Sequence, residues 1–172
     1  MLFIMNTVEL VLQCIGVALG YFSSLVKDKN KVILYACFSN LVSILIFALN
    51  DRLDGALSVI IIWLRCILFL FRDKYKTNIV VWICAIAHII VGVISYTDVF
   101  SIITISVPVI ICFTYWYGSI LSIKYISNIL SIFWIIYYIY LGLYITAINT
   151  VISIVLTSIS ILEIHKEQSK KE

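Results

Sequence analysis

Apolar runs about as long as a membrane-spanning helix occupy nearly the whole chain, and only short polar breaks separate them. A helix rises 1.5 Å per residue, so about 20 apolar residues cross the hydrocarbon core of a bilayer. Hydrophobic residues make up 63% of the 172 residues and charged residues 12%, whereas soluble domains average about half apolar and a quarter charged. The sequence therefore predicts an all-α, polytopic integral membrane protein with no room for a soluble module.

Charged or turn-like breaks, such as residues 27–31 and 72–76, divide the chain into seven predicted spans. The spans cover residues 8–26, 32–49, 54–71, 78–96, 99–117, 123–141 and 144–164. Because the breaks are short, we expect consecutive spans to be antiparallel neighbours. They would form a single membrane domain of residues 1–172 that ends in a cytoplasmic tail at 167–172.

The basic residues predict how this domain is oriented. If alternate breaks lie on opposite sides of the membrane, ten of the 12 Lys and Arg residues fall on one side, Arg52 falls on the other, and Arg65 lies within a span. The ten are Lys27, Lys29, Lys31, Arg72, Lys74, Lys76, Lys124, Lys166, Lys170 and Lys171. Basic residues favour the cytoplasmic side, so we expect the N-terminus outside and the C-terminus in the cytoplasm.

Residues 39–46, SNLVSILI, resemble residues 127–134, SNILSIFW. The matches are Ser39 with Ser127, Asn40 with Asn128, Ser43 with Ser131 and Ile44 with Ile132. If this echo records a duplication, residues 8–72 and 99–166 are two parallel three-helix repeats joined by a linker helix at 78–96, a 3+1+3 plan known among transporters. Coincidence in a chain rich in Ile and Ser is the alternative.

Several short motifs, spread over nearly the whole chain, resemble those of a known protein family. They are the stretch 39–56 with its Gly55-Ala56 turn, Arg65, Trp134 followed by Tyr137 and Tyr138, and Gly142. In these features the chain resembles the YgjV family of bacterial inner-membrane proteins, which implies the bacterial cytoplasmic membrane as its location but no assigned activity. The layout is also similar to that of the SWEET and PQ-loop carriers, although Pro108 is the single proline available as a hinge and no Pro-Gln dipeptide is present.

Arg65 is a charged residue inside a predicted span, where a charge is costly and needs a partner. Gly55, Ser58, Ile62 and Arg65 follow one another at spacings of 3, 4 and 3, so they share one helix face. A small, polar face favours a role for Arg65 toward a ligand or a gate. The alternatives are an arginine that snorkels to the headgroups or a structural clamp on neighbouring carbonyl groups.

Further polar and aromatic side chains complete a hypothetical solute site. The candidate substrate-binding residues are Arg65, Asn40, Ser43, Asn128, Ser131, Trp134, Tyr138 and Asn149. Amides, hydroxyls and an aromatic face suit a small polar solute, neutral or anionic, with Arg65 as the countercharge. Hydrogen bonding between helices is the alternative explanation for these residues. His88 has no acidic neighbour in sequence, so we expect it to be structural rather than a proton relay.

These observations favour a small-solute carrier or facilitator of SWEET-like architecture. The alternative is a non-transporting membrane partner or sensor. No cluster of His, Asp, Glu or Cys offers a catalytic base, a nucleophile or three metal ligands, so we expect no enzyme, no metal and no cofactor. The expected partners are the lipid bilayer, a small polar solute and, as an open possibility, a second copy in a homo-oligomer; we expect no nucleic acid.

Overall fold

The structure is a computed structural model that describes residues 7–49, 53–74, 77–94, 96, 99–140, 142 and 144–170. Within these ranges it describes the side chains of all residues except 47, 53–58 and 101. The described part of the chain contains α1 (Thr7–Leu25), α2 (Lys29–Leu49), α3 (Leu53–Leu70), the 3-10 helix η1 (Arg72–Lys74), α4 (Ile79–Ile94), α5 (Ser101–Tyr117), α6 (Ile120–Tyr140) and α7 (Tyr144–Ser169). The prediction of an all-α protein is confirmed.

Each of the seven predicted spans corresponds to one α-helix, and the largest difference is at the end of the chain. There α7 continues to Ser169, whereas the sequence predicted an end near residue 164. The additional turns consist largely of Glu, Lys and Gln, which are good helix formers. Ion pairs also stabilise this end of α7, because the ammonium of Lys27 lies 2.8 Å from a carboxylate oxygen of Glu163 and 2.6 Å from one of Glu167.

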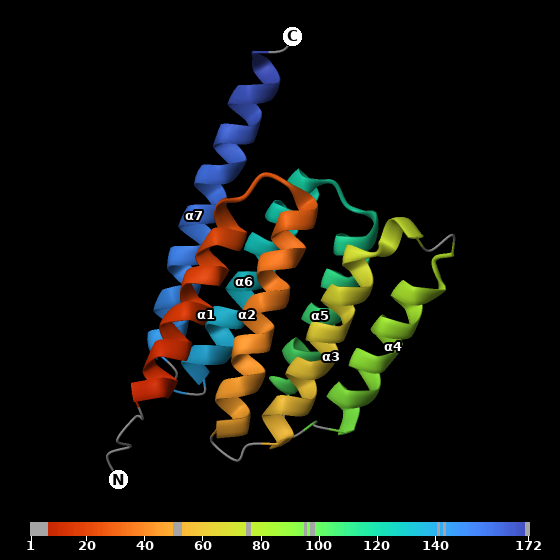
Figure 1. Ribbon diagram of the computed structural model, residues 1–172, viewed down its shortest axis with the longest axis vertical. Helices are drawn as coiled ribbons and strands as arrows, with labels where there is room; N and C mark the ends of the chain where they lie inside the picture. The colour runs from red at the N-terminus through yellow and green to blue at the C-terminus, as the bar shows by residue number, and fades with distance from the viewer. Residues whose placement is uncertain are drawn as a thin grey trace.

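The helices run alternately up and down and form a bundle (Figure 1). Helices α1, α2, α3, α5, α6 and α7 form a closed ring in which each packs on the next and α7 returns to α1. Helix α4 packs against α3 and α5, outside this ring. The start of α1 and the end of α7 lie at opposite ends of the bundle (Figure 1).

The outer surface is apolar, as expected for contact with lipid; Ile94 and Ile145, for example, are each 79% exposed. Among the described residues, four helical stretches are long and apolar enough to cross a membrane, namely Thr7–Leu25, Lys29–Ile46, Ile120–Tyr140 and Tyr144–Ser169. Three shorter apolar stretches accompany them, Val59–Leu70, Ile79–Ile94 and Ile102–Tyr117. The count of seven spans therefore stays a prediction.

The main buried cluster lies where α2, α3, α4 and α5 meet. It consists of Ile33, Cys37, Cys66, Phe69, Val81, Cys84, Ala85 and Cys112. The four cysteines in it are free thiols and pack as small apolar residues. This cluster fills the side of the bundle formed by α2, α3, α4 and α5.

Candidate functional site

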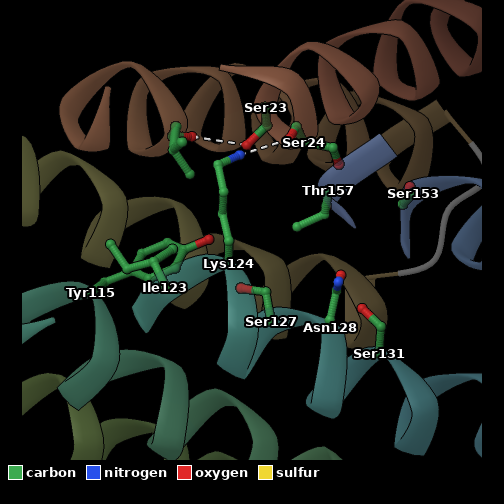
Figure 2. Close-up of a pocket in the computed structure, with 11 residues that line it drawn as sticks. Ser23, Ser24, Tyr115, Ile123, Lys124, Ser127, Asn128, Ser131, Ser153 and Thr157 are labelled. Atoms are coloured by element: carbon green, nitrogen blue, oxygen red, sulfur yellow. Dashed lines mark hydrogen bonds between the residues drawn. The ribbon is translucent and has the colours of Figure 1, made fainter. Parts of the chain in front are cut away.

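A polar cavity of about 120 Å³ lies between α1, α2, α5, α6 and α7 (Figure 2). It is lined by Ser23, Ser24, Val32, Tyr115, Ile123, Lys124, Ser127, Asn128, Ser131, Ser153 and Thr157. All but Val32 and Ile123 have polar side chains. Polar groups around an opening inside an apolar bundle make this cavity the candidate site.

Helix α6 supplies one continuous row of the lining. Lys124, Ser127, Asn128 and Ser131 are spaced 3, 1 and 3 residues apart, so their side chains project from one helix face, as Figure 2 shows. The amide of Asn128 donates a hydrogen bond to the hydroxyl of Ser158 on α7, at 3.1 Å. The row therefore faces α1 and α7 across the cavity.

Lys124 places a buried positive charge at the cavity, since the residue is only 2% exposed. Its ammonium donates a hydrogen bond of 2.7 Å to the carbonyl oxygen of Ser24, in the last turn of α1. Carbonyls in a last turn have no partner within their helix and carry the negative end of its dipole. Lys124 thus caps α1, and within the described part of the chain no carboxylate forms an ion pair with it.

Lys29 makes a similar contact from the first predicted repeat to the second. From the first residue of α2, its ammonium donates to the carbonyl oxygens of Gly118, at 2.7 Å, and Trp116, at 3.1 Å, at the end of α5. Each lysine therefore reaches from the second helix of one predicted repeat to the end of the first helix of the other. Lys29 does not line the cavity.

Arg65 lies elsewhere, between α3, α4 and α5, and is 5% exposed. Its Nη1 atom donates to the carbonyl oxygen of Pro108 at 3.3 Å and lies 3.4 Å from Nε2 of His88 and 3.7 Å from the sulfur of Cys112. The guanidinium carbon lies 5.8 Å from the centre of the Tyr115 ring. This geometry agrees with the structural clamp on a carbonyl, because the guanidinium stays inside the bundle instead of reaching outward.

The small face predicted for α3 includes Gly55 and Ser58, whose side chains lie outside the described part of the structure. The Nε atom of Arg65 is buried and has no hydrogen-bond partner among the described residues. Arg65 is not part of the cavity lining. The charged side chain that lines this cavity is that of Lys124, and the role of Arg65 toward a ligand stays a prediction.

Of the eight predicted site residues, Asn128 and Ser131 line the cavity. Asn40 donates to the carbonyl of Ala36 at 2.7 Å, within its own helix. The hydroxyl of Ser43 likewise bonds the carbonyl of Ser39, at 3.1 Å. The two halves of the sequence echo thus differ in their contacts, because the α6 copy lines the cavity and the α2 copy does not.

Asn149, Trp134 and Tyr138 also make contacts away from the cavity. The amide oxygen of Asn149 accepts a hydrogen bond of 3.0 Å from the hydroxyl of Tyr21, which joins α7 to α1. The rings of Trp134 and Tyr138 stack on each other along α6, with 5.6 Å between their centres. The structure therefore does not bring the eight residues to one place.

Lys124 is the site residue that sequence reasoning missed. Its charge was used only to predict orientation, as one of the ten basic residues on one side. The signal was nevertheless present, because Lys124 lies three and seven residues before Ser127 and Ser131, at helical spacing. In the described part of the chain, no group of three or more His, Cys, Asp or Glu residues could hold a metal ion.

The apolar exterior and polar interior cavity define the class: a helical membrane protein with an internal polar site. More specifically, the chain belongs to the Imp-YgjV family of bacterial inner membrane proteins, whose sequence profile matches residues 8–168. No curated protein and no solved structure matches the chain. The predicted membership of the YgjV family is confirmed, and the similarity to SWEET and PQ-loop carriers stays a prediction.

Proposed function

We propose that this protein is a small-solute carrier or facilitator and that the polar cavity is its solute site. The observation that carries the proposal is the buried ammonium of Lys124 beside an open, hydroxyl-lined space. Ionisable groups inside membrane bundles commonly mark the path of an ion or a substrate. The cavity also lies between the two predicted repeats, with α1 and α2 on one side and α5, α6 and α7 on the other. Passage of a solute requires no chemical step, so the proposal assigns no catalytic residue.

The 3+1+3 plan belongs to the same proposal, and helix packing supports it. Helices α1, α2 and α3 pack in sequence order, as do α5, α6 and α7. A rotation that places α1, α2 and α3 on α5, α6 and α7 also places the α1–α7 contact on the α5–α3 contact. Both contacts exist in the structure. The reciprocal caps made by Lys29 and Lys124 fit this rotation, while α4 lies outside the ring as a linker would.

We propose further that the N-terminus lies outside and the C-terminus in the cytoplasm. The support is that the α1–α2 turn, η1, the α5–α6 turn and the end of α7 lie together at one end of the bundle (Figure 1). Every described basic residue except Arg65 lies in or next to one of these segments; Arg52, Lys76 and Lys171 lie outside the described residues. A fluorescent protein fused after residue 172 should fluoresce, whereas an alkaline phosphatase fused there should be inactive. The opposite pair of results would contradict this orientation.

A non-transporting partner or sensor is the second candidate function. The observation that favours this function is a set of hydrogen bonds and ion pairs at the basic end of the bundle. Lys29 and Lys124 bond the ends of α5 and α1, and Lys27 forms ion pairs with α7. Such interactions between helices resist the movement of helices by which a carrier opens its site to each side of the membrane. The two functions differ in whether the cavity opens to both sides of the membrane.

Access to a cysteine at position 131 tests this difference. In a Cys14→Ser background, Ser131→Cys places a thiol in the cavity, while the four remaining native cysteines are buried. A carrier predicts that a membrane-impermeant maleimide labels this thiol from outside in spheroplasts and from inside in inverted vesicles. The Cys14→Ser parent is the matched control and should stay unlabelled. Labelling from only one side, or from neither, would contradict the carrier.

A further inference from the structure

We propose that the cavity binds a small anionic oxygen group, of the carboxylate or phosphate class, on the ammonium of Lys124. The proposal rests on the proposed function, because it names the solute class of the same site. The sequence left open whether the solute is neutral or anionic, and this proposal specifies an anionic one.

The first argument is the charge of the lining. Lys124 is its one charged residue, and among the described residues that line the cavity there is no Asp or Glu. An ammonium has three donors, and the bond to the Ser24 carbonyl uses one of them. A carbonyl neutralises none of the charge, and an unpaired charge in low-dielectric surroundings is strongly attracted to an anion.

The second argument is the state of the hydroxyl groups. Within the described part of the chain, several Ser and Thr hydroxyls inside helices bond a carbonyl four residues earlier, as Ser24, Thr114 and Ser158 do. Ser127, Ser131, Ser153 and Thr157 make no such bond to any described residue, although all four line the cavity. Hydroxyls that are not committed to the helix can donate to a ligand.

The third argument is size. An engineered apolar cavity of about 150 Å³ in another protein accommodates benzene, which has six non-hydrogen atoms. The cavity here, at about 120 Å³, is somewhat smaller, so it fits about four or five non-hydrogen atoms. Acetate and sulfate have this size. The phosphate of an anionic lipid headgroup offers the same chemistry from a second source.

Thermal unfolding of the purified full chain in a neutral detergent tests the proposal. Sodium acetate and sodium sulfate are titrated against sodium chloride at equal ionic strength, and a third arm adds phosphatidylglycerol to the micelles. We expect a saturable rise in Tm with acetate or sulfate, because a ligand that binds only the folded state stabilises it. Lys124→Gln should weaken the apparent affinity at least about tenfold, since it removes the charge.

Lys29→Gln is the matched control, because it removes the same kind of helix cap without touching the cavity. It should lower the starting Tm and keep the anion effect. If Lys124→Gln does not fold, Ser127→Ala combined with Ser131→Ala leaves the cap intact and should weaken the anion effect about fivefold or more, as expected for the loss of one or two hydrogen bonds.

The outcomes separate the two proposals. No anion effect in any arm, or an equal effect in Lys124→Gln and the wild type, overturns the anion site, whatever the labelling at position 131 shows. An effect of phosphatidylglycerol alone that disappears in Lys124→Gln supports the same chemistry with the lipid as its source. One-sided labelling at position 131 together with a Lys124-dependent acetate effect overturns the carrier and retains the anion site.

Discussion

Lys124 and Arg65 are both buried cations in an apolar bundle, and their surroundings differ. Lys124 lies beside a cavity lined with hydroxyls and caps the end of α1. Arg65 lies among α3, α4 and α5, where its neighbours are a carbonyl, an imidazole and a thiol. Arg65 does not line the cavity beside Lys124.

This difference separates two uses of a charge inside a membrane protein. A guanidinium enclosed by side chains can only hold those side chains together. An ammonium at the edge of an open space can also hold a ligand, because water or a solute can reach its remaining donors. A charged residue that stands out within a predicted membrane span, as Arg65 does, therefore need not be the one that binds a ligand.

The largest effect on stability should come from Arg65→Ala. The change removes the bond to the Pro108 carbonyl and leaves a void between three helices, so we expect a loss of about 3 kcal/mol. Lys124→Ala should cost less, about 1 kcal/mol, because water in the cavity can replace its bond. Unfolding of the purified variants in detergent measures both. Equal losses would remove the distinction between the two regions.

Arg65→Lys should have an intermediate effect, a loss of about 1–2 kcal/mol. An ammonium lacks the planar surface that faces the Tyr115 ring and cannot reach several partners at once. Acetate titration of this variant should still give the wild-type shift in Tm. A variant that keeps its stability but loses the acetate effect would move the solute site back to Arg65.

The two capping lysines should have similar and smaller effects. Lys29→Gln and Lys124→Gln each remove a cation from the end of a helix, which we expect to cost about 0.5–1 kcal/mol. The caps lie on different helix ends, so the double variant should lose the sum of the two. A strongly non-additive result in thermal unfolding would show that the caps act as one unit.

The ion pairs of Lys27 should contribute least, because they are exposed to solvent. Hydrogen bonds that the Lys27 ammonium donates to the carboxylates of Glu163 and Glu167 raise the pKa of Lys27 above its ordinary value. A group whose pKa is raised on folding contributes stability below its unfolded pKa and loses it as the pH rises through the folded pKa. The double change Glu163→Gln and Glu167→Gln should therefore lower Tm slightly near pH 8, and this effect should disappear as the pH rises through the raised pKa of Lys27.

Glu9→Gln is a matched control for this pair of changes, since Glu9 accepts a hydrogen bond from Gln13 within α1 and forms no ion pair with any described residue. It should leave Tm unchanged across the same pH range. A pH-independent loss in the Glu163 and Glu167 variant would mean that these side chains act through packing.

The helices and the family could be predicted from the sequence, because hydrophobic runs and their charged breaks are local signals. Asn128 and Ser131, which the echo of residues 39–46 singled out, line the cavity. The surroundings of Arg65 were not predictable, because they depend on α4 and α5 packing against α3. Lys124 was overlooked because its charge had already been explained by topology, although it lies on the same helix face as Ser131.

The most direct measurement is the rate at which a maleimide modifies Ser131→Cys, with and without acetate, in the presence of Lys124 and of Lys124→Gln. If the cavity binds an anion on Lys124, acetate should slow the labelling when Lys124 is present and have no effect in the Lys124→Gln variant. Equal labelling rates with and without acetate while Lys124 is present would contradict the assignment of this cavity as the solute site.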